Sequence, residues 1–239
     1  MQELFRVIED PRTCSYLPQE RASLEIRLVT NMDAGEYRDL MERGYRRFGI
    51  QIFRPACKSC RECRSMRVPV QQFTLSRSQK RVLRLNRHLR AELHPAFATG
   101  QHVDLFNRYH RYMHRHRGWP LQQVTLQTYY RDFIAGAADS GKQWLYFDGE
   151  VLVGVALMDA VPGAISLVYC YYHPEWRDQS LGTYSILNQL LWAKAAGFDY
   201  AYLGYWVEGC PSLSYKSRYV PHEILQGLPG EGQSAVWKS

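Results

Sequence analysis

The amino-acid sequence predicts an α+β fold in which helices flank a mixed sheet. Between Asp33 and Arg117 the apolar residues recur with helical spacing, whereas from Gln143 onward apolar runs alternate with turn signals, as in strands. The chain has 239 residues, of which 46% are hydrophobic. This is enough to bury a core, as one large or two small domains.

Start signals predict three helices in the first half. Asp33, with Glu36 three residues later, can form a capping box. Ser76 or Ser78 can cap a second helix, and a third is expected from about Gln101 to Arg117. The residues expected to face the core are Tyr37, Leu40 and Met41 in the first helix, Val82, Leu85 and Leu89 in the second, and Val103, Phe106, His110 and Met113 in the third.

The second half predicts an antiparallel meander. Turn signals at Asp148-Gly149 and Pro162-Gly163 separate three apolar runs, WLYF, VLVGVALMDAV and ISLVYCYY. Residues 180–196 then predict a helix that packs on the sheet, and residues 200–204 predict a further strand. This order of strands, helix and strand resembles the fold of the N-acetyltransferase (GNAT) superfamily.

The turn before the predicted helix, WRDQSLGT at residues 176–183, is comparable with the glycine-rich pyrophosphate loop of acetyl-CoA-dependent acetyltransferases. Backbone N–H groups at a helix N-terminus bind anions, and glycines let a phosphate approach closely. Only Gly182 is present here, and Ser180 stands where a glycine is expected. The sequence therefore favours the fold but argues against coenzyme A as its acyl donor.

Positive charge is concentrated in residues 76–117. The whole chain has a formal net charge of +7, and this segment holds ten Lys or Arg residues against two acids, Glu92 and Asp104. Phosphate backbones attract such concentrations, because each neutralised phosphate releases a condensed counterion. A nucleic acid is one partner that fits; a membrane surface and a merely solvated helix face are the alternatives.

The cysteines predict either a metal site or reduced structural thiols. No apolar stretch approaches the roughly 20 residues of a membrane helix, and the N-terminal MQELFRVIED is charged where a signal peptide is apolar, so we expect a cytoplasmic protein. A disulfide framework is not expected there. Two-residue spacing suits a zinc or iron-sulfur site formed by Cys57, Cys60 and Cys63, with Cys14 as the natural fourth ligand. Cys170 and Cys210 are expected to be small packed residues.

Further segments extend these patterns over most of the chain. In order they are CSYLP (14–18), RGYRRFG (43–49), CKSCREC (57–63), RVPV (67–70), SRSQKR (76–81) with Asn86, SLGTYS (180–185), YLGYW (202–206) and YKSRYVP (215–221). Their order and spacing resemble the aminoacyl-tRNA protein transferases of the N-degron pathway, in particular the short bacterial aspartate/glutamate leucyltransferases. Each segment alone is a weak signal, but together they span Cys14 to Pro221.

The resemblance implies a specific aminoacyl transfer. Leucine would move from leucyl-tRNA to the α-amine of proteins that begin with Asp or Glu, which marks them for degradation. An α-amine has an unperturbed pKa of about 7.7 to 8.0 and the aminoacyl ester is reactive, so neither a strong base nor a cofactor is required for the transfer. The alternatives are an arginyl-tRNA donor, a CoA-dependent N-acetyltransferase, and a non-catalytic metal-containing RNA-binding module.

Under this resemblance the chain divides into a Cys-containing N-terminal region, residues 1–75, and a GNAT-like transferase domain, residues 76–239, which includes the basic helical segment 76–117. An acidic acceptor side chain needs a cation in a partly desolvated pocket. The predicted substrate-binding residues are Lys216, Arg218, Tyr172 and Tyr202, the predicted catalytic residues are Tyr205 and Tyr215, and the predicted tRNA contacts are Arg77, Lys80, Arg81, Arg84 and Arg87. Core or rim packing is an equal alternative for any single tyrosine.

Overall fold

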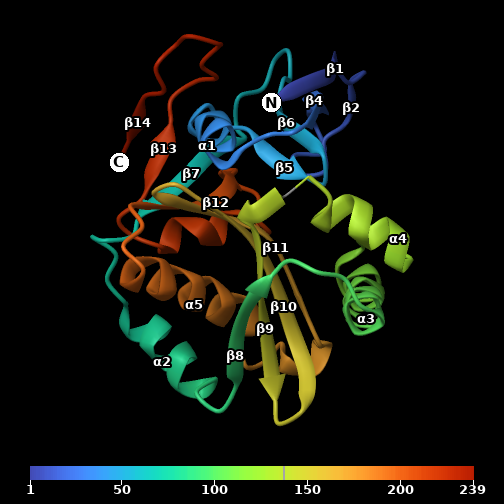
Figure 1. Ribbon diagram of the computed structural model, residues 1–239, viewed down its shortest axis with the longest axis vertical. Helices are drawn as coiled ribbons and strands as arrows, with labels where there is room; N and C mark the ends of the chain where they lie inside the picture. The colour runs from blue at the N-terminus through green and yellow to red at the C-terminus, as the bar shows by residue number, and fades with distance from the viewer. Residues whose placement is uncertain (137) are drawn as a thin grey trace.

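The computed structural model describes residues 1–136 and 138–239, and it confirms a mixed α+β architecture. A four-stranded sheet has the order β1-β4-β6-β5, and an eight-stranded sheet has the order β14-β13-β7-β12-β11-β10-β9-β8 (Figure 1). The elements of the first half are β1 (Gln2–Ile8), β2 (Arg12–Thr13), β3 (Arg21–Ala22), β4 (Leu24–Thr30), α1 (Ala34–Glu42), β5 (Arg46–Phe48), β6 (Gln51–Pro55), β7 (Arg64–Pro69), α2 (Arg77–Leu85), β8 (Arg90–Pro95), α3 (Gly100–Arg117) and α4 (Leu126–Tyr129). Those of the second half are η1 (Tyr130–Ile134), η2 (Ala138–Ser140), β9 (Gly141–Asp148), β10 (Val151–Val161), β11 (Ala164–Tyr172), η3 (Pro174–Trp176), α5 (Leu181–Ala195), β12 (Tyr200–Trp206), η4 (Ser214–Arg218), β13 (Glu223–Leu225) and β14 (Trp237–Lys238).

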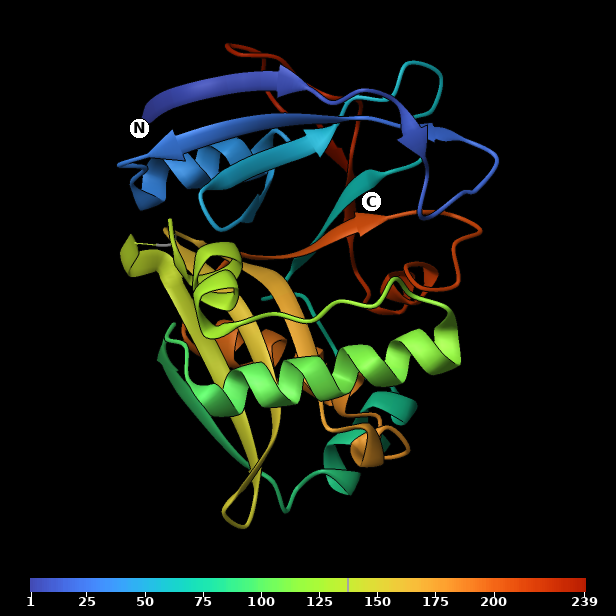
Figure 2. The same ribbon diagram turned by 90° about the vertical axis from the view of Figure 1, so that its right-hand side faces the viewer.

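The four-stranded sheet and α1 form a layer over one end of the large sheet, as Figure 2 shows. The predicted capping box of α1 is confirmed: the Glu36 N–H donates to Asp33 Oδ1 over 2.8 Å, and the Asp33 N–H donates to Glu36 Oε2 over 3.0 Å. The predicted core residues of this helix are buried, and they pack between the small sheet and strands β10 to β12 of the large one. We call this part of the molecule, residues 1–55, the N-terminal layer.

The predicted meander is confirmed as β9, β10 and β11, which pair antiparallel in chain order. α5 then leads to β12, which lies parallel to β11 but pairs with it over only three residues, Ala164 to Ser166 against Tyr200 to Tyr202. On its other side β12 pairs antiparallel with β7, with an irregularity between Tyr202 and Gly204. Beyond the short parallel pairing, β11 and β12 therefore leave peptide groups facing a space between them.

Helices cover both faces of the large sheet (Figure 1): α2 and α5 lie on one face, and α3 and α4 on the other. The predicted start of α2 at Ser76 is confirmed, because Ser76 and Gln79 form a capping box. The predicted end of α3 at Gly118 is also confirmed, since Gly118 adopts the left-handed region at φ 66°. The expectation that Leu85 faces the core is wrong, since it is 47% exposed. α2 ends at this residue, and the half-buried Leu83 packs on the core instead.

A domain boundary at residue 75 stays a prediction about folding units. β7 precedes residue 75 in the sequence, but it pairs with β12 and β13 and so belongs to the large sheet. In the described part of the chain, no helix is long and apolar enough to cross a membrane.

Candidate functional site

Gly204 marks the place where the large sheet opens beneath the N-terminal layer. Its φ of +86° lies in the left-handed region, which favours glycine. A Cβ at this position would lie 3.4 Å from Lys216 Nζ and 3.6 Å from Arg46 Nη2. Two cationic side chains, one from β5 and one from η4, thus meet over the backbone of β12, and the absence of a side chain on Gly204 leaves room for both.

Lys216 is buried, with only 8% of its surface exposed. Its Nζ donates to the main-chain oxygen of Tyr205 over 2.7 Å. Burial, together with repulsion from Arg46, lowers the pKa of Lys216 to about 7. The ammonium is therefore close to half protonated in the neutral range, and an anion placed beside it would raise its pKa.

Arg46 is equally buried, also at 8% exposure, and reaches into the space between β11 and β12. Its Nη2 donates to the main-chain oxygen of Leu167 over 2.5 Å. Leu167 directly follows the last residue of β11 that pairs with β12, so the guanidinium satisfies a carbonyl that the parallel ladder leaves free. Its Nη1 is buried and has no hydrogen-bond partner within the described residues.

The two predicted cations Lys216 and Arg218 are not brought together. Arg218 is exposed, and its main-chain oxygen accepts a hydrogen bond of 3.2 Å from Gln79 Nε2 in the first turn of α2. It therefore lies on the α2 side of the molecule, whereas Lys216 turns inward toward Gly204. Arg46, which the sequence analysis missed, stands beside Lys216 instead.

Two of the predicted tyrosines, Tyr172 and Tyr215, lie in a half-buried aromatic group at the end of β11. The ring centroids of Tyr109 and Tyr172 are 5.2 Å apart. Burial and the neighbouring Cys170 thiol raise the pKa of Tyr215 to about 12, and burial likewise raises the pKa of Tyr172. The exposed Arg177 is close enough to act electrostatically on Tyr172. The aromatic group is therefore flanked by positive charge.

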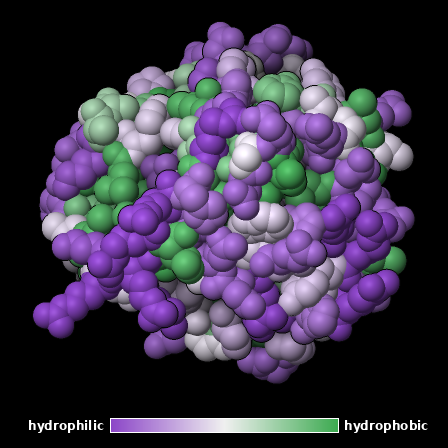
Figure 3. Space-filling model, turned by 90° about the horizontal axis from the view of Figure 1, so that it is seen from below, coloured by the Kyte–Doolittle hydropathy of each residue, from purple (hydrophilic) through white to green (hydrophobic). Residues whose placement is uncertain are grey.

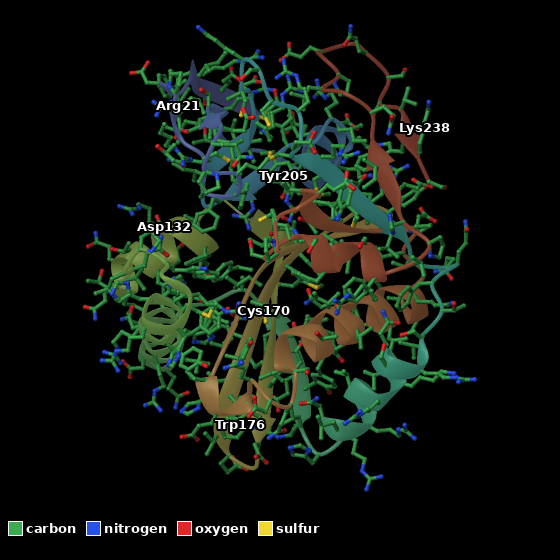
Figure 4. The ribbon with its side chains drawn as sticks, turned by 180° about the vertical axis from the view of Figure 1, so that it is seen from behind. Arg21, Asp132, Cys170, Trp176, Tyr205 and Lys238 are labelled. Atoms are coloured by element: carbon green, nitrogen blue, oxygen red, sulfur yellow. The ribbon has the colours of Figure 1, made fainter. Side chains whose placement is uncertain are left out.

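The other two, Tyr202 and Tyr205, are structural in this geometry. The Tyr202 hydroxyl accepts from Arg67 Nη1 over 3.3 Å in the core beneath α1. The Tyr205 hydroxyl donates to the main-chain oxygens of Gly44 and Phe53, over 3.1 and 3.2 Å, and so ties β12 to the N-terminal layer. In Figure 4 Tyr205 lies where the N-terminal layer meets the large sheet, and its contribution to the site is the carbonyl that holds Lys216.

The four cysteines proposed as ligands lie near one another, since Cys14, Cys57 and Cys60 all act electrostatically on Cys63. Cys14 and Cys57 are buried, and Cys60 and Cys63 are half-buried. Burial, with the surrounding thiols, raises the pKa of Cys63 to about 12. Cys14 Sγ accepts N–H groups of its own turn. Within residues 1–136 and 138–239, no group of three His, Cys, Asp or Glu side chains is placed as a set of metal ligands, and the metal site stays a prediction.

Next to these thiols lies a cavity of about 180 Å³. It is lined by the cysteines of the C-x-x-C-x-x-C motif, by Pro55, and by residues 225–228. Cys63 lines this cavity and also acts electrostatically on Lys216. The cavity therefore lies close to the paired cations.

The predicted tRNA contacts form a second, separate surface. All five are exposed on or just after α2, and none makes a salt bridge among the residues that the structure describes; we call Arg77, Lys80, Arg81, Arg84 and Arg87 the α2 basic face. Figure 3 shows the molecule from below, the side on which α2 lies in Figure 1, and hydrophilic side chains cover most of this side. A surface with this much unpaired positive charge suits a polyanion.

Comparisons with known proteins agree with the sequence motifs. The family model "Arginine-tRNA-protein transferase, N terminus" matches residues 12–81, and "Arginine-tRNA-protein transferase, C terminus" matches residues 101–226. A protein of Campylobacter jejuni named aspartate/glutamate leucyltransferase is 37% identical over 93% of this chain and 92% of its own length. A protein of Helicobacter hepaticus with the same name is 35% identical over 98% of both chains.

Among solved structures, FemX is similar with a TM-score of 0.51, covering 85% of this chain and 69% of its own, at 9% sequence identity. This likeness concerns the fold alone. The two family models match most of the N-terminal layer and most of the large sheet, and the relatives match over 93% and 98% of this chain. The family expected from the sequence motifs is thereby confirmed: this chain belongs to the arginine-tRNA-protein transferase family.

Proposed function

We propose that this chain transfers leucine from leucyl-tRNA to the α-amine of proteins that begin with Asp or Glu, in the cytoplasm, and so marks them for degradation. The observation that carries the proposal is the 37% identity, over 93% of the chain, to a protein named aspartate/glutamate leucyltransferase. The paired cations Arg46 and Lys216 and the α2 basic face are consistent with it, because the reaction brings together an acidic acceptor and a polyanionic donor.

In the proposed reaction the acceptor α-amine attacks the carbonyl carbon of the leucyl ester. The new C–N bond forms, the C–O bond to the tRNA breaks, and the 3′ hydroxyl of the tRNA leaves with a proton while the amine loses one. Positioning of amine and ester in attack geometry supplies most of the acceleration. Tyr215, half-buried with a raised pKa, remains protonated and can donate a hydrogen bond at this centre. Tyr205 contributes to the site through its main-chain oxygen, which accepts a hydrogen bond from Lys216 Nζ.

We assign the tRNA to the side of the molecule that carries α2. The α2 basic face contacts phosphates, and the half-buried rings of Tyr172 and Tyr215 offer faces on which unpaired bases of the 3′ end stack. α2 is joined to the start of α5 by Asn86, whose Nδ2 donates to the main-chain oxygen of Gln179 over 2.7 Å. This contact places the end of α2 beside the turn that leads from Tyr172 to α5.

Salt dependence tests this docking surface. We expect the affinity for leucyl-tRNA to fall steeply with salt, and the double variant Arg81→Gln/Arg84→Gln to reduce the slope of log K against log[salt] by about 2, because each lost phosphate contact removes roughly 0.9 from it. The matched control is Arg12→Gln/Arg21→Gln, which removes two exposed cations from β2 and β3 of the N-terminal layer. Equal slopes for the two double variants would rule out α2 as the docking surface.

We also propose that the large sheet is N-acetyltransferase-like. The support is its meander, the crossover helix α5 and the separation of the parallel strands β11 and β12. α5 begins after Ser180, which adopts φ +57°, and Gly182 is the only glycine of that turn. Saturation of the purified protein with acetyl-CoA should therefore leave aminoacyl transfer unchanged. Competition between acetyl-CoA and aminoacyl-tRNA would instead indicate a coenzyme A site.

The name of the family model favours a second donor, arginyl-tRNA. One assay separates the two: the purified protein is mixed with radiolabelled leucyl-tRNA or arginyl-tRNA and with peptides that begin with Asp, Glu or Ala. We expect label to move from leucyl-tRNA to the Asp and Glu peptides only. Transfer from arginyl-tRNA instead would show that arginyl-tRNA is the donor. Transfer from neither tRNA would reject the proposed function.

A further inference from the structure

The paired cations Arg46 and Lys216 lack the carboxylate partners that other buried cations of this chain have. The structure buries five arginines, and four of them have an acidic side chain within salt-bridge distance; these pairs are Arg27 with Glu3, Arg47 with Asp159, Arg54 with Glu25, and Arg67 with Glu42. Among the described residues Arg46 has no such partner, and neither has Lys216, the one lysine in the buried set.

Two buried cations side by side are unfavourable, since each loses hydration and repels the other. Their hydrogen-bonding capacity is also incomplete. Among residues 1–136 and 138–239, Arg46 Nη1 has no partner and the Lys216 ammonium makes one hydrogen bond, although it carries three N–H groups. Both cationic groups lie within 4 Å of the position that a Cβ on Gly204 would occupy, and their unused donors fit an anion that the folded chain itself does not supply.

The anion that binds here must be small. Both cations are more than nine-tenths buried, so the phosphates of the base-paired part of the tRNA, held within a rigid duplex, do not reach them. The exposed α2 basic face is available for those phosphates. A carboxylate on the side chain of a chain terminus can be inserted, and its two oxygens match one N–H of the guanidinium and one of the ammonium.

We propose that Arg46 and Lys216 together bind the carboxylate of the acceptor's first side chain, so that this pair sets the preference for acidic N-termini. This rests on the proposed function for the nature of the acceptor. In this proposal the second cation is Arg46 and not the predicted Arg218, which is exposed beside α2. Gly204 is then a specificity-determining position as well, because a side chain there would occupy the space between the two cations.

The test compares acceptors that differ only in charge. Transfer from saturating leucyl-tRNA is measured with two peptides that begin with Asp or with the nearly isosteric Asn. For Arg46→Met and for Lys216→Met we expect the Asp:Asn ratio of kcat/KM to fall roughly 30-fold or more, as when one partner of a buried charge pair is removed. The KM for leucyl-tRNA should stay as in the wild type. Arg46→Lys, which keeps the charge, should recover part of the ratio.

The matched control is Arg43→Met. Arg43 lies three residues before Arg46 and is half-buried. Among the described residues, its side chain donates a hydrogen bond only to the main-chain oxygen of Asp39. The control should keep the wild-type Asp:Asn ratio. If folded Arg46→Met and Lys216→Met lose rate equally for Asp and Asn peptides, the pair stabilises the reaction centre or the fold instead, and the inference is overturned.

A binding measurement separates failure of this inference from failure of the proposed function. Calorimetric titration of the same Asp and Asn peptides needs no donor tRNA, so it is informative even if the wild type transfers no leucine. We expect the wild type to prefer the Asp peptide, and Lys216→Met to bind both alike. A wild type that transfers leucine but binds the two peptides equally would overturn the inference while leaving the proposed function in place.

Discussion

Replacing Asp159 by alanine is expected to lower the free energy of unfolding by about 3–5 kcal/mol, because it leaves Arg47 buried without its counter-charge. The two side chains form a bidentate pair: Arg47 Nη2 lies 2.7 Å from Asp159 Oδ1, and Nε lies 3.1 Å from Oδ2. Arg47 is 3% exposed and Asp159 is fully buried. Since Arg47 lies on β5 and Asp159 on β10, this pair joins the N-terminal layer to the large sheet.

Urea unfolding, followed by circular dichroism, measures this effect. The control is Glu62→Ala, which removes the partner of an exposed pair with Arg64, 3.7 Å apart, and should change the free energy of unfolding by about 0–1 kcal/mol. The apolar double variant Arg47→Met/Asp159→Leu should recover most of the stability that Asp159→Ala loses. A loss below about 1 kcal/mol for Asp159→Ala would show that water or rearrangement compensates the arginine.

The elements that local sequence signals specify could be predicted. The α1 capping box, the Ser76 cap of α2 and the β9–β11 meander depend on residues only a few positions apart, and all are present. The position of β7 could not be predicted in this way. It pairs with β12, more than 130 residues later, so its place in the sheet is decided by tertiary packing rather than by its own sequence.

The sequence pairs Lys216 with Arg218 as carboxylate-binding cations, and that role stays a prediction. Lys216 is buried, but Arg218 is two positions away on a 3-10 turn and exposed. With three residues per turn, positions i and i+2 point in different directions, so the two side chains diverge. Arg46 and Arg47 are adjacent in a strand and point to opposite faces, one toward Lys216 and one toward Asp159. The sequence RGYRRFG showed both arginines but not which of them faced the site.

The preference for Asp over Asn acceptors is expected to decrease as the pH rises above neutrality. Lys216 has a pKa of about 7 in the free protein, lowered by burial and by Arg46 on β5, and raised in part by the thiols of Cys210 and Cys63. Only the protonated ammonium attracts a carboxylate. About one pH unit below 7 the pair is almost fully charged and the Asp:Asn ratio of kcat/KM is near its maximum; as the pH rises through 7 the charged fraction, and with it the ratio, falls by up to about tenfold per pH unit.

The ratio isolates this titration, because deprotonation of the acceptor α-amine raises the rate for both peptides and cancels between them. The measurement is kcat/KM for the Asp and Asn peptides from pH 6 to pH 9 at constant ionic strength. Lys216→Arg is the diagnostic variant: a guanidinium has a pKa above about 12, so its ratio should be independent of pH over this range. A wild-type ratio that is also flat would mean that Lys216 stays charged or takes no part in recognition, and the loss of selectivity in Lys216→Met distinguishes the first case from the second.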